Sequence, residues 1–235
     1  MNRTMVVGIV ALLALIALGA MTAIRGGPQE SPDQASVAPA SPVADQDQDL
    51  LLGPRTRGSA SAPIMIYEVS DFQCPYCRDF WKETLPALER EYIQPGKARL
   101  VFINFPITAI HQNASAAHEL AMCAAEQNLF WPVHDLLFAH QERWAGLADP
   151  AGVFRALADS ARVDPTALNG CYSAGKARAM VQAETQASFQ AGVKSTPSFI
   201  VNGALLAGHA PIEDWRPILD SIYAVVTKLP GEMIR

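Results

Sequence analysis

Three consecutive segments of the chain predict a strand, a helix and a second strand. Residues 63–69 are rich in apolar and aromatic side chains and indicate a buried strand. Residues 75–92 carry large apolar side chains at helical spacing, and Pro75 suits the first turn of a helix. Residues 98–105 are again apolar and typical of a strand. Two strands joined through a helix of this size predict a parallel pair.

The next long stretch has helical character throughout. Asp149–Pro150 and Asp164–Pro165 each resemble a helix start, in which an acidic N-cap precedes a proline at the first helical position. Residues 173–191 are expected to continue as one helix. The side chains expected to pack from this last helix are Met180, Val181, Ala187 and Phe189.

Strand signals return only near the C-terminus. Residues 198–201 and 204–207 flank Asn202–Gly203, a hairpin turn signal, and a terminal helix follows. Pro217 is awkward inside that helix, so we expect a kink or a helix start there. Together with a short edge strand within residues 53–62, the pattern predicts one α/β domain over 53–235. In it, a helical insertion at about residues 108–192 separates a β-α-β half from a β-β-α half.

The N-terminus carries a long apolar run. Residues 5–24 contain no charge, and these twenty positions match the bilayer core, whereas the apolar part of a signal peptide is shorter. We therefore expect residues 1–25 to be an uncleaved single-pass membrane anchor, with a cleaved signal peptide as the alternative. Arg3 ahead of the run favours an extracytoplasmic domain. Residues 26–52 are rich in Pro, Ser, Gln, Asp and Ala, which predicts a flexible linker.

Composition narrows the function classes. The net charge of -5, without a basic run, argues against a nucleic-acid partner. The chain has 4 cysteines, an even number that permits two disulfides in an oxidising compartment. We expect no cofactor and no metal, and a monomer. Histidines and tryptophans of the helical stretch are expected to lie in the core or at contacts between helices.

Cys74 and Cys77 form a Cys-x-x-Cys motif between the first strand and the following helix. That order places Cys74 at a helix N-terminus, where unpaired N–H groups and the helix dipole favour a thiolate. We expect Cys74 to be the exposed nucleophile and Cys77 the buried cysteine that resolves the mixed disulfide. The alternatives are an inert disulfide and half of a zinc site, but no second Cys or His pair has metal-ligand spacing.

Three blocks in this order resemble the DsbA-like thiol–disulfide oxidoreductases of the thioredoxin superfamily. They are residues 70–77, residues 130–138 and residues 195–203. The resemblance spans about residues 62–227 and implies a thioredoxin-like fold that carries a helical insertion. It also implies that Pro197 is a cis-proline facing the cysteines, and that Thr196 offers backbone groups to a substrate strand. A proline at a strand start is consistent with an edge that an extended peptide can join.

The resemblance implies an oxidase that introduces disulfides into reduced, unfolded exported proteins and is re-oxidised by a membrane partner. The best-known oxidases of this family carry histidine where this chain has Tyr76. Tyrosine brings no positive charge, so we expect the Cys74 thiolate to be stabilised less. The alternatives are an isomerase or reductase, and a peptide-binding chaperone. Related isomerases usually have a dimerisation domain, for which residues 26–52 are too short and polar.

Three further residues are expected to matter. Cys123 and Cys171 lie in separate predicted helices, and in an exported protein we expect them to form a structural disulfide. Glu68 lies on an apolar strand six residues before Cys74. A solvent-facing position is the alternative, but thioredoxin-like proteins resemble this arrangement with a buried acid beneath the resolving cysteine. We therefore expect Glu68 to exchange a proton with Cys77.

Overall fold

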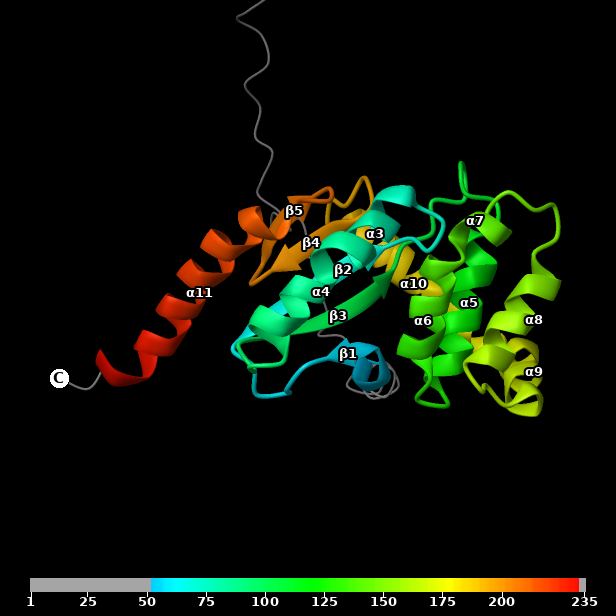
Figure 1. Cartoon of the computed structure of the whole chain (residues 1–235), viewed down its shortest axis with the longest axis horizontal. Helices are drawn as coiled ribbons and strands as arrows, with labels where there is room; N and C mark the ends of the chain where they lie inside the picture. The colour runs from blue at the N-terminus through cyan, green and yellow to red at the C-terminus, as the bar shows by residue number, and fades with distance from the viewer. Residues whose placement is uncertain (1–51, 233–235) are drawn as a thin grey trace, which may run out of the picture. The chain divides into compact units, whose positions relative to one another are not determined.

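The structure, a computed structural model, describes residues 52–232 and contains a five-stranded sheet (Figure 1). The spatial order is β1-β3-β2-β4-β5; β2 and β3 are parallel, and each other neighbouring pair is antiparallel. The predicted parallel pair and the C-terminal hairpin are therefore confirmed. The strands are β1 (Thr56–Arg57), β2 (Ile64–Ser70), β3 (Ala98–Asn104), β4 (Ser198–Val201) and β5 (Ala204–Ala207).

The helix after the cysteines is continuous but not regular. Leu85 donates its N–H to the Phe80 carbonyl five residues earlier, which widens the turn. Pro86 follows and has no N–H to donate, so the wide turn accommodates the missing bond without ending the helix. Its successive segments are α3 (Pro75–Asp79), the π-helical η2 (Phe80–Thr84), α4 (Leu85–Leu88) and the π-helical η3 (Glu89–Ile93).

The two faces of the sheet are covered differently. On one face Ile64 and Ile66 of β2 pack with Phe80 of the helix after the cysteines and with Trp215 of α11 (Ile212–Glu232). On the other face Val69 packs in a smaller cluster with Phe105 and Val193, and Val193 lies just beyond the last insertion helix. This alternation along β2 follows from the two-residue period of a strand, which sends successive side chains to opposite faces.

The helical insertion occupies the chain between β3 and β4. Figure 1 shows α5 to α9 gathered beside the sheet, with their labels grouped at one side of the view. Phe130 and Trp144 are fully buried among these helices, so the insertion has its own core. The helices are α5 (Ala114–Ala125), α6 (Phe130–Ala139), α7 (Gln141–Trp144), α8 (Ala151–Ser160), α9 (Pro165–Ala174) and α10 (Lys176–Gln190).

Two predicted helix starts differ in outcome. Asp164 is the N-cap of α9 and accepts the Ala167 N–H, with proline at the first helical position as expected. At α8 the N-cap is Pro150 itself, so the prediction for this helix is wrong by one residue. Asp149 instead accepts the Ala151 N–H from one residue further back. The first N–H of α8 is still satisfied by an acid, which explains the similar sequence signal.

Two other local expectations are wrong, and a third is narrowed. The helix expected over 173–191 is interrupted at Gly175, whose φ of 69° lies in the left-handed region that glycine adopts without cost. Ala187 and Phe189 are exposed, the latter 65 %, because α10 buries a different face that includes Val181. The terminal helix begins at Ile212, so the alternative that Pro217 starts it is excluded, and a kink at Pro217 stays a prediction.

The predicted membrane anchor or signal (residues 1–25) and all of the predicted linker except Leu52 lie outside the described residues. Within residues 52–232, no helix combines the length and the apolar character needed to cross a bilayer.

Candidate functional site

Cys74 is the N-cap residue of α3 and has extended backbone angles (φ -72°, ψ 125°), with Pro75 at the start of the helix. Its N–H bonds the Asp71 carbonyl at 3.0 Å, which closes a tight turn before the helix. Cys74 is 5 % exposed and Cys77 is 0 % exposed. The expectation of an exposed Cys74 is therefore wrong in degree, and the loop before β4 lies against its side chain at Thr196.

The two thiols have opposite electrostatic environments. The pKa of Cys74 is lowered to about 6, chiefly because the Cys77 thiol donates a hydrogen bond to its sulfur. Burial opposes this lowering. Thr196 and the backbone N–H groups of Tyr76 and Cys77 at the start of α3 lower the pKa further. The pKa of Cys77 is raised well above its usual value, first by burial and then by the Cys74 sulfur. At neutral pH the pair therefore holds one proton, on Cys77.

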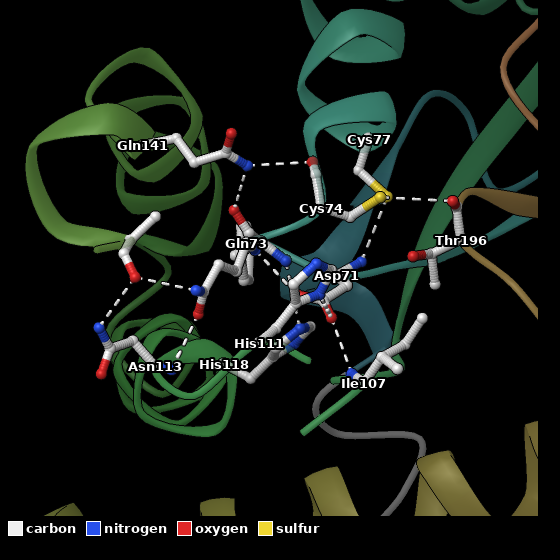
Figure 2. A network of polar contacts seen from close by, with 12 residues as sticks. Asp71, Gln73, Cys74, Cys77, Ile107, His111, Asn113, His118, Gln141 and Thr196 are labelled. Carbon is white, nitrogen blue, oxygen red and sulfur yellow. Dashed lines mark hydrogen bonds and ion pairs between the residues drawn. The ribbon is translucent and has the colours of Figure 1, made fainter. Parts of the chain in front are cut away.

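The loop before β4 faces this pair. The Thr196–Pro197 peptide bond is cis. The Thr196 carbonyl oxygen lies 3.4 Å from Cys74 Sγ, as Figure 2 shows by a dashed line. Within residues 52–232 the Thr196 N–H has no hydrogen-bond partner. A backbone donor without a partner beside a reactive sulfur is suited to pair with an incoming extended chain.

Phe72 anchors the segment that carries Cys74. It is fully buried and stacks on Phe102 of β3 with 4.9 Å between ring centroids, and its ring lies tilted against Phe138 of α6 at 5.1 Å. Burying such a ring contributes about 2–3 kcal/mol, so the position of the motif is held by the joint between sheet and insertion. The cysteines lie in the same apolar cluster as Phe72, so they cannot shift without disturbing the core that the insertion shares with β3.

Two side-chain amides hold the same segment, one from Gln141 of the insertion and one from Gln73 within the segment itself. Gln141 of α7 donates through Nε2 to the Phe72 carbonyl at 2.7 Å and to the Cys74 carbonyl at 3.0 Å. On the other side, the Asn113 N–H donates to Gln73 Oε1 at 2.8 Å (Figure 2). Because each amide binds backbone or a neighbouring side chain, the turn before Cys74 is fixed from both flanks.

A buried polar chain runs from the motif to the start of the domain. The Phe72 N–H donates to His118 Nε2 at 3.4 Å, and His118 Nδ1 donates to Asn104 Oδ1 at 2.7 Å. Asn104 Nδ2 donates to Glu184 at 2.6 Å, and Glu184 pairs with Arg55 at 2.7 Å. Burial lowers the pKa of His118 to about 4, so the ring is neutral at pH 7 and its two nitrogens have distinct roles.

Asp71 connects the motif with the loop after β3. Its carboxylate accepts the N–H of Gln73 and the N–H of Ile107, both at 2.7 Å. It also bonds His111 Nδ1 at 2.8 Å, and the three contacts appear together in Figure 2. The Asp71 N–H in turn lies 3.4 Å from Cys77 Sγ. This fully buried residue therefore makes backbone hydrogen bonds to both cysteines, with the Cys74 N–H and with the Cys77 sulfur.

Glu68 is buried on β2, where it faces Phe102 and Phe199 of the two neighbouring strands. Neither carboxyl oxygen has a hydrogen-bond partner among the described residues. Burial raises the pKa of Glu68 to about 7; Ser70 and Arg57 oppose the rise, although the Ser70 hydroxyl does not reach hydrogen-bonding geometry. Ser70 lies on the same face of β2 as Glu68 and opposes the raised pKa of both Glu68 and Cys77.

The family model of the thioredoxin proteins matches residues 52–221 of the chain. The chain belongs to this thioredoxin family. Among relatives in sequence, the Na(+)/H(+) antiporter NhaA 3 of Salinispora tropica is 32% identical over 180 residues. That match covers 77% of this chain but 26% of the antiporter, so the chain spans about a quarter of that relative's length.

Other thioredoxin-family similarities concern disulfide chemistry by name. A probable disulfide bond formation protein D of Bacillus anthracis is 37% identical over 86 residues, covering 37% of this chain and 40% of that protein. Among solved structures, α-DsbA1 of Wolbachia pipientis superposes with a TM-score of 0.67 at 20% identity, covering 74% of this chain and 94% of that one. The DsbA-like thioredoxin fold implied by the sequence resemblance is therefore confirmed.

The remaining cysteines of this thioredoxin-family chain lie within the insertion. Cys123 of α5 and Cys171 of α9 form a disulfide with a sequence separation of 48. Both are buried in the core of the insertion, where the bond joins two helices. Within residues 52–232, no cluster of three or more His, Cys, Asp or Glu side chains could hold a metal ion.

Sequence reasoning missed Asp71, His111, Asn113 and Gln141. The hydrogen bonds from His111, Asn113 and Gln141 to the segment before Cys74 span 40 to 69 residues of chain, and no local pattern records such contacts. Of these four residues, Asp71 could have been found from the sequence, because a polar side chain three residues before Cys74 in a buried turn needs hydrogen-bond partners.

Proposed function

We propose that this chain is an exported thiol–disulfide oxidoreductase that introduces disulfides into other exported proteins. The observation that carries the proposal is the divided pair of thiols at the start of α3. Cys74 has a pKa of about 6 and Cys77 keeps its proton, beside a cis bond before Pro197. A low nucleophile pKa stabilises the reduced enzyme and so favours the oxidising direction.

In this proposal a substrate thiolate attacks Cys74 in the oxidised enzyme. The Cys74–Cys77 bond breaks, a mixed disulfide forms at Cys74, and Cys77 leaves as a thiolate that takes a proton from Glu68. A second substrate thiolate then attacks the substrate sulfur of the mixed disulfide and releases Cys74 as a thiolate. Two electrons pass from two substrate thiols to the enzyme, and the thiol pair ends with one proton, on Cys77. Of the two protons that the substrate thiols release, one restores Glu68 and the other goes to solvent.

The substrate surface we propose combines backbone and apolar contacts. The N–H and C=O of Thr196 would pair with an extended segment on either side of the substrate cysteine. Tyr76, Ile110 and Leu147 are exposed by 63 %, 72 % and 39 %, and we call them the apolar rim. Asn113, in the same loop as Ile110, connects that loop with the segment before α3 and with the Leu147 loop, because it contacts Gln73 and donates to the Leu147 carbonyl at 2.9 Å. A rim of this kind suits unfolded chains rather than one folded partner.

The location and the partner are further parts of the proposal. The apolar run at residues 5–24 supports a membrane tether, with the catalytic domain on the extracytoplasmic side. The dithiol left after each turnover needs an electron acceptor, and a re-oxidising protein in the same membrane would supply it. A cleaved signal peptide and a soluble exported enzyme are the alternative, which membrane extraction separates from the tether.

The reduction potential of the Cys74–Cys77 pair tests the direction. After equilibration with glutathione couples, we expect a value far less negative than the roughly -270 mV of thioredoxin. The oxidised protein should also form disulfides in reduced, unfolded ribonuclease, and Cys74→Ala should abolish this. A potential near that of thioredoxin would assign a reductase instead. Aggregation suppression that survives in Cys74→Ala without any thiol exchange would indicate a chaperone.

A further inference from the structure

His111 lies in the loop between β3 and α5, and its ring is held against the active-site motif. Nδ1 is 2.8 Å from Asp71 Oδ2, and the side chains of His111 and Asp71 are 13% and 0% exposed. The Nε2 edge has no hydrogen-bond partner within residues 52–232. The ring is thus fixed at one nitrogen and uncommitted at the other.

Asp71 explains why a positive charge is needed at this place. Its carboxylate accepts two backbone N–H bonds and the bond from His111, as an ionised acceptor does. An unbalanced negative charge this close to Cys74 would oppose formation of a thiolate there. A protonated His111, 2.8 Å from the Asp71 carboxylate, balances that charge.

The contacts join this pair to both cysteines. The Asp71 carbonyl accepts the Cys74 N–H at 3.0 Å, and the Asp71 N–H points at Cys77 Sγ. The pKa of His111 is raised, first by its bond to Asp71 and further by the charges of Asp71 and Cys74, while burial opposes the rise. A charged Cys74 therefore favours the imidazolium, which by reciprocity favours a charged Cys74.

We propose that the His111 imidazolium stabilises the Cys74 thiolate and supplies the positive charge that Tyr76 does not provide. The charge comes from the loop after β3 rather than from between the two cysteines. This inference rests on the proposed thiol exchange and adds to it the residue that sets the reactivity of Cys74. The other histidine beside Asp71 cannot take the role, because His118 is fully buried and neutral.

The step that His111 assists is release of Cys74. When the second substrate thiolate attacks the mixed disulfide, the bond to Cys74 breaks and its electron pair stays on Cys74 Sγ. The imidazolium stabilises that developing charge and keeps its own proton. The titratable groups that act on His111 are Asp71 and Cys74, so loss of its proton at higher pH should weaken the thiolate.

His111→Gln tests this directly, because glutamine keeps an N–H donor for Asp71 and removes the charge. We expect the pKa of Cys74, read from the pH profile of alkylation of the reduced protein, to rise by about one unit. The reduction potential should become more negative by about 30 mV, the equivalent of a tenfold change in the exchange constant. His111→Lys should restore both values in part, and His140→Gln, which alters a histidine without such contacts, should change neither.

A reciprocal measurement keeps the proposal testable if His111→Gln folds poorly. In Cys74→Ser the pKa of His111, followed by proton NMR, should fall by about as much as the Cys74 value rises in His111→Gln. An unchanged His111 titration in Cys74→Ser, or a Cys74 pKa equally low in folded His111→Gln, would overturn the proposal. If wild-type Cys74 itself titrates near 9, the proposed function fails instead, which distinguishes the two failures.

Discussion

Glu68 and Cys77 both hold their protons more tightly than the same groups in water, and burial is the main cause in each case. For Glu68 the effect is large because both oxygens lack a partner among the described residues. A carboxyl group with a pKa of about 7 is half protonated at neutral pH, so it can give or take a proton during exchange.

Glu68→Gln should therefore stabilise the reduced protein, and more so at high pH. Because the folded pKa is raised from 4.5 to about 7, wild-type stability falls as pH rises through this range. The gain in the variant should be small at pH 4.5 and reach at most about 3 kcal/mol above pH 7. Urea unfolding at both pH values measures it, and Glu213→Gln, an exposed position, is the matched control.

The same variant should resolve mixed disulfides more slowly at Cys77 while Cys74 is alkylated at nearly the wild-type rate. A wild-type rate of resolution would show that Glu68 is not the proton carrier. Equal stabilisation at pH 4.5 and pH 8 would show that the carboxyl group is not the source of the stability change.

The roles of residues whose chemistry depends on neighbours in the sequence could be predicted from the sequence. The thiol motif, the cis bond at Pro197 and the burial of Glu68 all follow from strand and helix patterns or from family motifs. The burial of Cys74 could not be predicted in the same way, because the loop that lies against its side chain comes from elsewhere in the chain. His111 was missed for the same reason: its partner Asp71 is 40 residues away.

At the scale of elements, the order of strands and helices was predictable because each carries its own period. Breaks inside helices were harder. Gly175 separates α9 from α10 although apolar residues continue on both sides, and Pro86 sits in a helix that bypasses it through a wide turn. The covered face of α10 depended on which helices pack against it, so the exposure of Phe189 could not follow from spacing alone.

The disulfide between α5 and α9 is an element-scale constraint that should stabilise the insertion without entering the chemistry. Replacing Cys123 and Cys171 by alanine should lower the free energy of unfolding by up to roughly 4 kcal/mol in the chain-entropy model. Thiol exchange by the folded variant should remain close to wild type. Urea unfolding and ribonuclease oxidation measure the two quantities.

The single variants provide the control for this pair. Each one breaks the same bond, so Cys123→Ala and Cys171→Ala should each lose nearly as much stability as the double variant. Losses that add up independently would show that packing, and not the bond, carries the effect. A stable double variant without exchange activity would contradict the structural role.

At the scale of the whole chain, the redox pair lies where three parts of the fold meet. Phe72 packs into the insertion, Thr196 precedes β4, and the polar chain from His118 reaches Arg55 near β1. Such a site can be tightly held and still meet a flexible substrate at its apolar rim. The division into halves was predictable from the element order, whereas the meeting point required the packing of distant segments.

The last prediction concerns how the whole chain is placed in the cell. The apolar run of twenty residues would span about 30 Å as a helix, which matches the bilayer core. The polar composition of residues 26–52 is that of a linker with a reach of about 30 Å, enough for contact with a membrane partner and with exported substrates.

The full-length protein should stay with membranes after carbonate washing, and a variant without residues 1–25 should not. Cys74 should react with a membrane-impermeant maleimide in reduced cells whose outer envelope has been permeabilised while the cytoplasmic membrane stays intact. A soluble mature form that begins near residue 21 would instead show that the segment is a cleaved signal, and labelling only after lysis would place the domain on the cytoplasmic side.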